Sequence, residues 1–88
     1  MKEYIKDPEA ILDYGSDWSA WLEDDELVTS EWKVPQGLDV VNEAMTPIRT
    51  VIWLGGGKLG RDYVVTNYVE TKAGREDARS KKIKVRHR

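Results

Sequence analysis

The densest group of side chains that could perform chemistry lies in residues 13–26, DYGSDWSAWLEDDE, which hold six carboxylates and two tryptophans. Paired carboxylates catalyse acid–base reactions when burial separates their pKa values. Carboxylates also bind calcium when their oxygens converge around a tight turn. Four of these six are consecutive, at 23–26, and the segment lacks the alternating aspartates of a calcium-binding hand. We therefore expect a solvated acidic segment, with no metal, no cofactor and no catalytic residue.

Few side chains in the rest of the chain could take part in a reaction. The single histidine, His87, stands next to the last residue, where a general base would lack supporting structure. The absence of cysteine excludes a disulfide framework and a thiolate metal site. The run GGGKLG at 55–60 lacks the Lys-Ser/Thr pair of a phosphate-binding loop and is expected to be a turn. The sequence predicts that the protein is not an enzyme.

The elements that hold these residues are predicted to be short strands separated by turn residues. The only helix candidate is the short piece from Trp18 to Glu26, with Ser16 or Asp17 as its N-cap. Alternation and turn signals predict strands around Ala10, Leu12 and Tyr14, and at Leu27–Val34, Leu38–Met45, Thr50–Leu54, Tyr63–Thr71 and Arg79–Arg86. Six or seven strands at near-regular spacing indicate an all-β, immunoglobulin-like (fibronectin-like) antiparallel β-sandwich. We expect one such domain over residues 1–88, with the acidic, Trp-containing segment at 16–26.

One spacing is more specific. In LGRDYVV at 59–65, Gly60 precedes Tyr63 by three residues and Val65 follows it by two. This resembles the tyrosine corner of immunoglobulin-like sandwiches, in which a tyrosine hydroxyl bonds to nearby backbone.

The tyrosine corner sets the register of the neighbouring strands. Because successive side chains alternate between faces, residues 52, 54, 63, 65 and 69 are predicted to face inward, and residues 51, 53, 64, 66 and 68 outward. Asn67 then falls on the inward side, where either a bulge or a position at the end of the core would account for a polar residue.

Aromatic residues supply the candidates for contact with partners. Trp32 is expected to be buried in the sandwich. Trp18 and Trp21 either share one side of a helical turn or cap the open end of the sandwich. Trp53 and Tyr68 face outward from opposite sheets. Exposed aromatic residues are enriched at protein–protein contacts, but single exposed aromatic residues also occur without a functional role. The candidate interface residues are therefore Trp18, Trp21, Trp53 and Tyr68.

Charge is unevenly distributed along the chain. Residues 1–31 hold ten acidic residues and two lysines, a net −8, whereas residues 72–88 hold eight basic and two acidic residues, a net +6. Such blocks either act as interaction tails or lie side by side and neutralise each other. No apolar run reaches the length of a membrane span, and no secretory signal is recognisable, so we expect a protein made in a cytoplasm.

Several motifs together resemble a known family. They are Asp13-Tyr14-Gly15, Asp17-Trp18, Trp21-Leu22, Trp32 to Pro35, Trp53 to Gly56, Tyr63 to Asn67, and Gly74 to Ser80. As a set, and over about Lys6 to Val85, they resemble the phage fiber-tail adaptor proteins, a family of small tailed-bacteriophage proteins. The third glycine of the turn, Gly57, and the basic end KKIKVRHR depart from the pattern as local variation.

The resemblance implies a non-enzymatic structural protein of the virion, made in the bacterial host. Its partners would be other phage structural proteins of the tail, neck or capsid, and copies of itself, with no nucleic acid and no membrane. A capsid decoration or head-completion protein is the first alternative. A carbohydrate-binding module that uses Trp18, Trp21 or Trp53 is the second, and a nucleic-acid binder that uses residues 79–88 is the third.

Overall fold

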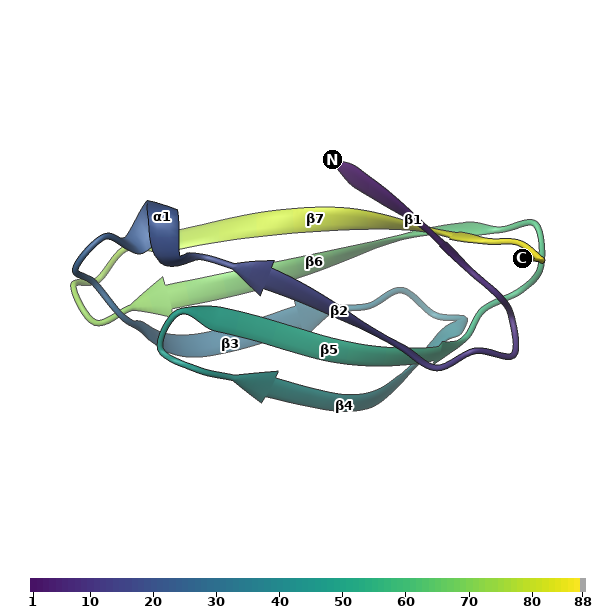
Figure 1. Cartoon of the computed structure of the whole chain (residues 1–88), viewed down its shortest axis with the longest axis horizontal. Helices are drawn as coiled ribbons and strands as arrows, with labels where there is room; N and C mark the ends of the chain where they lie inside the picture. Colours follow the sequence, from purple (N-terminus) through teal and green to yellow (C-terminus); the bar gives the residue numbers. More distant parts are fainter. Residues whose placement is uncertain (88) are drawn as a thin grey trace.

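A computed structural model describes residues 1–87, which form a β-sandwich of seven strands with one short helix (Figure 1). One layer is a four-stranded sheet in the order β1-β7-β6-β3, and the other is a three-stranded sheet in the order β2-β5-β4. The predicted all-β sandwich is confirmed. The elements are β1 Lys2–Lys6, β2 Leu12–Asp17, α1 Ser19–Leu22, β3 Leu27–Lys33, β4 Leu38–Met45, β5 Arg49–Gly56, β6 Asp62–Thr71 and β7 Glu76–Val85.

The first strand is the element that sequence reasoning missed. β1 pairs with β7 in parallel, whereas the other strand pairs are antiparallel. Its sequence KEYIK does not alternate apolar and polar residues, because a lysine occupies an inward position. That lysine, Lys6, is fully buried. The Lys6 ammonium donates hydrogen bonds to the carbonyl oxygens of Gly56 at 2.6 Å and Asp7 at 2.9 Å. Burial lowers the pKa of Lys6, while the carboxylates of Asp7 and Asp39 oppose that shift.

The helix is shorter than predicted. It covers Ser19–Leu22 and not Trp18 to Glu26, and its N-cap is Trp18 and not Ser16 or Asp17. The Asp17 carboxylate still accepts a hydrogen bond from the amide of Ser19 at 2.9 Å. At the other end Glu23 adopts a φ of 57°, in the left-handed region, which ends the helix before the acidic run.

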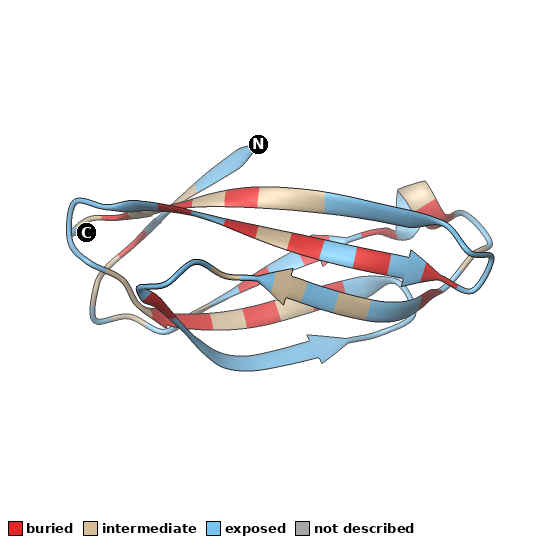
Figure 2. Ribbon diagram, turned by 180° about the vertical axis from the view of Figure 1, so that it is seen from behind, coloured by how far each residue is buried: buried red, intermediate tan, exposed pale blue. Residues whose placement is uncertain are grey.

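The strand register follows the tyrosine corner. The amide of Lys58 donates a hydrogen bond to the Tyr63 hydroxyl at 3.0 Å, as the spacing predicts. Burial alternates along the strands on either side of this corner (Figure 2). Ile52, Leu54 and Val65 are fully buried. The predicted inward and outward faces of β5 and β6 are thus confirmed.

The core has two parts. The larger cluster lies between the sheets and consists of Tyr14, Leu38, Ile52, Leu54, Tyr63, Val65, Ile83 and Val85. The smaller cluster lies beside α1 and consists of Trp18, Leu22, Leu27 and Val69. Trp32 packs against the larger cluster but is only half-buried, so the expectation of a buried sandwich tryptophan is met in part.

Asn67 connects the two parts of the core. Its side chain is fully buried, and its carbonyl oxygen accepts hydrogen bonds from Trp18 Nε1 at 3.2 Å and from the Thr50 hydroxyl at 2.7 Å. Its amide group donates to Ser30 Oγ at 2.9 Å. A buried polar group is tolerated when it is hydrogen-bonded, which explains the inward asparagine.

The acidic N-terminal and basic C-terminal blocks lie side by side. Glu3 is 3.5 Å from Lys84, and Asp25 is 3.1 Å from Arg75. Of the two interpretations of the charge blocks, the structure therefore supports mutual neutralisation.

Candidate functional site

The end of the sandwich at α1 holds two of the predicted contact residues. Trp18 is fully buried and packs edge-on against Trp21, with 5.3 Å between ring centroids. The Arg79 guanidinium lies 3.9 Å from the centre of the Trp18 ring, and that of Arg75 lies 4.3 Å from the centre of the Trp21 ring. The two rings share one side of the helical turn, which is one of the two roles considered for this pair, and together they cover Leu22, Leu27 and Val69. Trp18 presents no surface to a partner, and Trp21 is half-covered.

The acidic segment is partly tied into the fold by Asp25. Its carboxylate accepts hydrogen bonds from the amide of Ala73 at 3.1 Å and from Arg75 Nε at 3.1 Å. A hydrogen bond with the Thr71 side chain is the largest cause that lowers the pKa of Asp25 to about 2. Arg75 also donates to the carbonyl oxygen of Leu22 at 3.0 Å, at the end of α1. Asp25 therefore fastens the loop to the β6–β7 turn, while Glu23, Asp24 and Glu26 remain exposed.

Trp53 lies on the outer face of the three-stranded sheet. It is half-buried, and its register neighbours are Asp13 on β2 and Asn42 on β4. The next register position places Val51 between Gly15 and Ala44. We call the surface formed by Ile11, Gly15, Val41, Ala44, Val51 and Trp53 the Trp53 face.

The Trp53 face combines exposed apolar side chains with polar ones, because Asp13 and Asn42 stand directly beside Trp53. Ile11 is 60% exposed and Val41 is 53% exposed. A Cβ atom on Gly15 would meet only ordinary van der Waals contacts, the nearest at 3.5 Å, and Gly15 has no left-handed φ. The fold itself therefore does not require glycine at this position. Glycine within a strand often marks a place where another backbone approaches closely.

Tyr68 lies on the opposite side of the molecule, on the outer face of the four-stranded sheet. It is 42% exposed, and the Lys33 ammonium lies 5.2 Å from the centre of its ring. The surrounding hollow of about 480 Å³ is lined mainly by polar residues, among them Glu31, Glu70 and Glu76. Trp53 and Tyr68 thus mark two separate surfaces, as their strand parity predicts.

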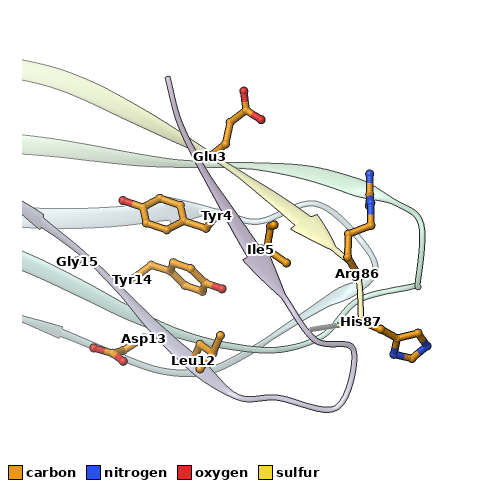
Figure 3. Close-up of a pocket in the computed structure, with 9 residues that line it drawn as sticks. All are labelled: Glu3, Tyr4, Ile5, Leu12, Asp13, Tyr14, Gly15, Arg86 and His87. Atoms are coloured by element: carbon orange, nitrogen blue, oxygen red, sulfur yellow. The ribbon is translucent and has the colours of Figure 1, made fainter.

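Sequence reasoning missed a groove on the long side of the sandwich, between β1 and β2. Figure 3 shows Tyr4 from β1 and Tyr14 from β2 in this groove, and their rings pack edge-on with 5.3 Å between centroids. The groove has a volume of about 830 Å³, and Ile5 and Leu12 add apolar surface to it. Because β1 was not predicted, no sequence signal placed residues 4 and 14 together.

The described residues contain neither a cluster of metal-ligating side chains nor a helix that could span a membrane. Within residues 1–87, no group of three or more His, Cys, Asp or Glu side chains is placed to hold a metal ion. Over the same range, no helix is both long and apolar enough to cross a bilayer.

The overall architecture is that of an immunoglobulin-like sandwich. It is similar to the solution structure of the PKD domain from KIAA 1837 protein, with a TM-score of 0.52 and 20% sequence identity over 97% of this chain and 78% of that chain. No curated protein is similar enough to count as a match.

Comparison of the sequence with known families is more specific than the fold. Residues 6–84 match the family described as Gp77, Podophage GP4 fiber-tail adaptor protein gp77. Because this match spans most of the 88 residues, the chain belongs to that podophage fiber-tail adaptor family. The predicted resemblance is confirmed, and the family is one of phage structural adaptors.

Proposed function

We propose that the protein joins tail and fiber components of a podophage particle through protein–protein contacts, without catalysing a reaction. The observation that carries this proposal is the Trp53 face, a sheet surface on which Ile11 and Val41 are exposed beside Trp53, in a chain of the fiber-tail adaptor family. A structural protein of the tail or fiber would cover this face in the virion.

The composition of the Trp53 face supports a protein partner. Buried aromatic residues near the centre of an interface contribute much of its binding energy, and Val51 lies next to Trp53 on the same face of β5. Asp13 and Asn42, on either side of Trp53, supply polar groups with which a partner would form hydrogen bonds. Gly15 leaves the backbone of β2 open to a close approach.

An adaptor needs a second contact, and Tyr68 supplies the candidate. It lies on the other sheet, so a partner at Tyr68 and a partner at the Trp53 face would not compete for the same surface. Copies of the same chain are included among the candidate partners of either surface.

The test uses particles of the phage that encodes this chain. Quantitative mass spectrometry with chemical cross-linking is expected to find the protein at a small symmetric copy number, cross-linked to tail or fiber proteins. Cross-links to the capsid at the copy number of capsid subunits would make it a decoration protein. Absence from the particle would refute both interpretations.

Variants then locate the contact. Trp53→Ser, and separately Val41→Asp on the same face, are expected to yield particles that lack fibers. Leu59→Ser is the matched control, because Leu59 is 48% exposed in the loop between β5 and β6, away from the Trp53 face. Thermal melts of each purified variant separate loss of contact from loss of folding. Normal fiber content with both Trp53-face variants would refute the assignment of this face.

A further inference from the structure

A second opening lies beside the Tyr4–Tyr14 groove, between β2 and the edge formed by β1 and β7. It has a volume of about 390 Å³, and its lining includes Lys2, Ser16, Arg79 and Lys81. We call these four residues and the space between them the cationic slot. No sequence pattern indicated this cluster, because its members come from three different strands.

Among residues 1–87, Lys2 and Lys81 form no ion pair with a carboxylate. Lys2 and Lys81 are direct register partners in the parallel β1–β7 pair, so their side chains extend from the same face of the sheet. Like charges directly opposite each other on neighbouring strands are destabilising. Among residues 1–87, the carboxylates that form ion pairs do so with other cations.

Lys81 is held in place at the slot. Its side chain is largely buried, with 8% of the residue exposed, and its ammonium lies 5.5 Å from the centre of the Tyr4 ring. Arg79 is held as well, because it donates a hydrogen bond to the carbonyl oxygen of Asp17 at 2.8 Å. The Asp17 carboxylate, which is the acidic group of the lining, accepts the amide of Ser19, and its charge interacts with Arg79, which leaves Lys2 and Lys81 for a ligand.

Ser16 gives an independent sign of a missing ligand. It is 5% exposed, and its hydroxyl has no hydrogen-bond partner among the described residues. Buried hydroxyl groups are nearly always hydrogen-bonded, since burial without a partner is costly. A ligand oxygen in the slot would accept a hydrogen bond from this hydroxyl and neutralise the adjacent lysines.

The strand that borders the slot has a free edge. Within the described residues 1–87, β2 pairs with β5 on one side and has no strand on the other. Exposed edges of this kind accept an added strand from a partner, with backbone hydrogen bonds for affinity and side-chain pockets for specificity. Gly15 on β2 lines both the cationic slot and the Tyr4–Tyr14 groove, so one extended segment along β2 would reach both.

We propose that the cationic slot binds a glutamate or aspartate side chain on an extended segment of a partner protein. The segment adds to the free edge of β2 and places an apolar side chain in the Tyr4–Tyr14 groove. Charge complementarity selects a carboxylate for the slot. A nucleic-acid backbone fits less well, because the chain carries a net charge of −2 and lacks the positive excess of a phosphate-backbone binder.

The test uses the purified chain and two peptides. Each is a seven-residue acetylated and amidated peptide of alternating threonine and valine, with either glutamate or glutamine at its centre. Isothermal titration calorimetry at low ionic strength is expected to show roughly tenfold tighter binding of the glutamate peptide, as a charge-assisted hydrogen bond supplies. Peptide-induced amide shifts in NMR spectra are expected at Ser16 and Lys81.

Two variants and one control test the cations. Lys81→Met keeps the buried stem and removes the charge, and it is expected to abolish the preference for glutamate. Lys2→Gln changes an exposed residue and is expected to weaken the preference without affecting folding. Lys33→Met is the matched control, because it removes the same charge from the opposite face of the molecule and should leave affinity unchanged.

Three results would overturn the proposal. They are equal binding of the two peptides, an equal loss with Lys33→Met and Lys81→Met, and tighter Lys81-dependent binding of a short DNA duplex than of the glutamate peptide. The inference rests on the proposed adaptor function in one respect only, namely that the partner in the slot is a structural protein of the phage particle. If the peptide binds while Trp53-face variants assemble normally, the slot stands and the Trp53 contact is wrong. If the variants lose fibers while no peptide binds, the reverse holds.

Discussion

Replacement of Asn67 by alanine tests how the two parts of the core are held together. The Asn67 side chain accepts hydrogen bonds from Trp18 on the helical end and from Thr50 on β5, and it donates to Ser30 on β3. The variant Asn67→Ala removes all three of these hydrogen bonds at once. The indole N–H and the Thr50 hydroxyl would then remain buried without an acceptor, because both residues are fully buried.

The expected cost follows from the two orphaned donors. A buried polar group that loses its partner costs about 1–3 kcal/mol, so two such groups cost about 2–6 kcal/mol. At roughly 0.05–0.15 kcal/mol per residue, a chain of 88 residues has a free energy of unfolding of about 4–13 kcal/mol. The variant is therefore expected to lose a large share of its stability, with a fall in Tm of roughly 10 °C or more.

Urea and thermal unfolding, followed by circular dichroism and tryptophan fluorescence at neutral pH, would measure this loss. The second substitution Thr50→Val, in the Asn67→Ala background, is expected to restore about 1 kcal/mol because it removes one orphaned donor. Thr66→Ala is the control, since it breaks the Thr66–Ser80 hydrogen bond on the outer face of the same strand pair. A change of less than about 0.5 kcal/mol in Asn67→Ala, within the range of ordinary surface substitutions, would refute the reasoning.

Three further substitutions have defined outcomes. Tyr63→Phe removes the acceptor of the Lys58 amide and is expected to cost about 1 kcal/mol, or a fall in Tm of roughly 4–8 °C; an unchanged melting curve would show that the tyrosine corner is not stabilising. The folded-state pKa of Asp25 is about 2, below its ordinary 3.8, so the stability it contributes is present above that ordinary value and is lost as pH falls toward 2. Asp25→Asn should therefore flatten the pH dependence of the urea midpoint between those values, and an identical slope would contradict the assignment. Ser16→Ala removes an unpartnered hydroxyl and should leave the free energy of unfolding unchanged, or raise it by up to about 1 kcal/mol, while it weakens binding of the glutamate peptide; a marked loss of stability would show that the hydroxyl is already satisfied.

Much of the sandwich was predictable because local patterns determine it. Strand alternation identifies which side chains enter the core, and the spacing of Gly60 and Tyr63 identifies the tyrosine corner. That corner then assigned Ile52 and Leu54 to the interior and Trp53 to the surface. The set of family motifs was sufficient to indicate a phage adaptor.

The short N-terminal elements were harder to predict for a physical reason. β1 buries Lys6, whose ammonium donates hydrogen bonds to the carbonyl oxygens of residues 7 and 56. No local sequence pattern indicates that a lysine will be buried in this way. Trp18 offered two roles in the sequence. Only its packing against Leu22 and Val69, and its hydrogen bond to Asn67, make it part of the core.

The sequence by itself therefore determined the class of fold, the family and the orientation of residues along the central strands, because each depends on neighbours in the chain. The tertiary structure alone decided which distant residues share a surface. The parallel pairing of β1 with β7 brings Lys2 beside Lys81, and the packing of the two sheets brings Ser16 to the same opening. The cationic slot exists only because strand pairing and sheet packing bring together side chains that are far apart in the sequence.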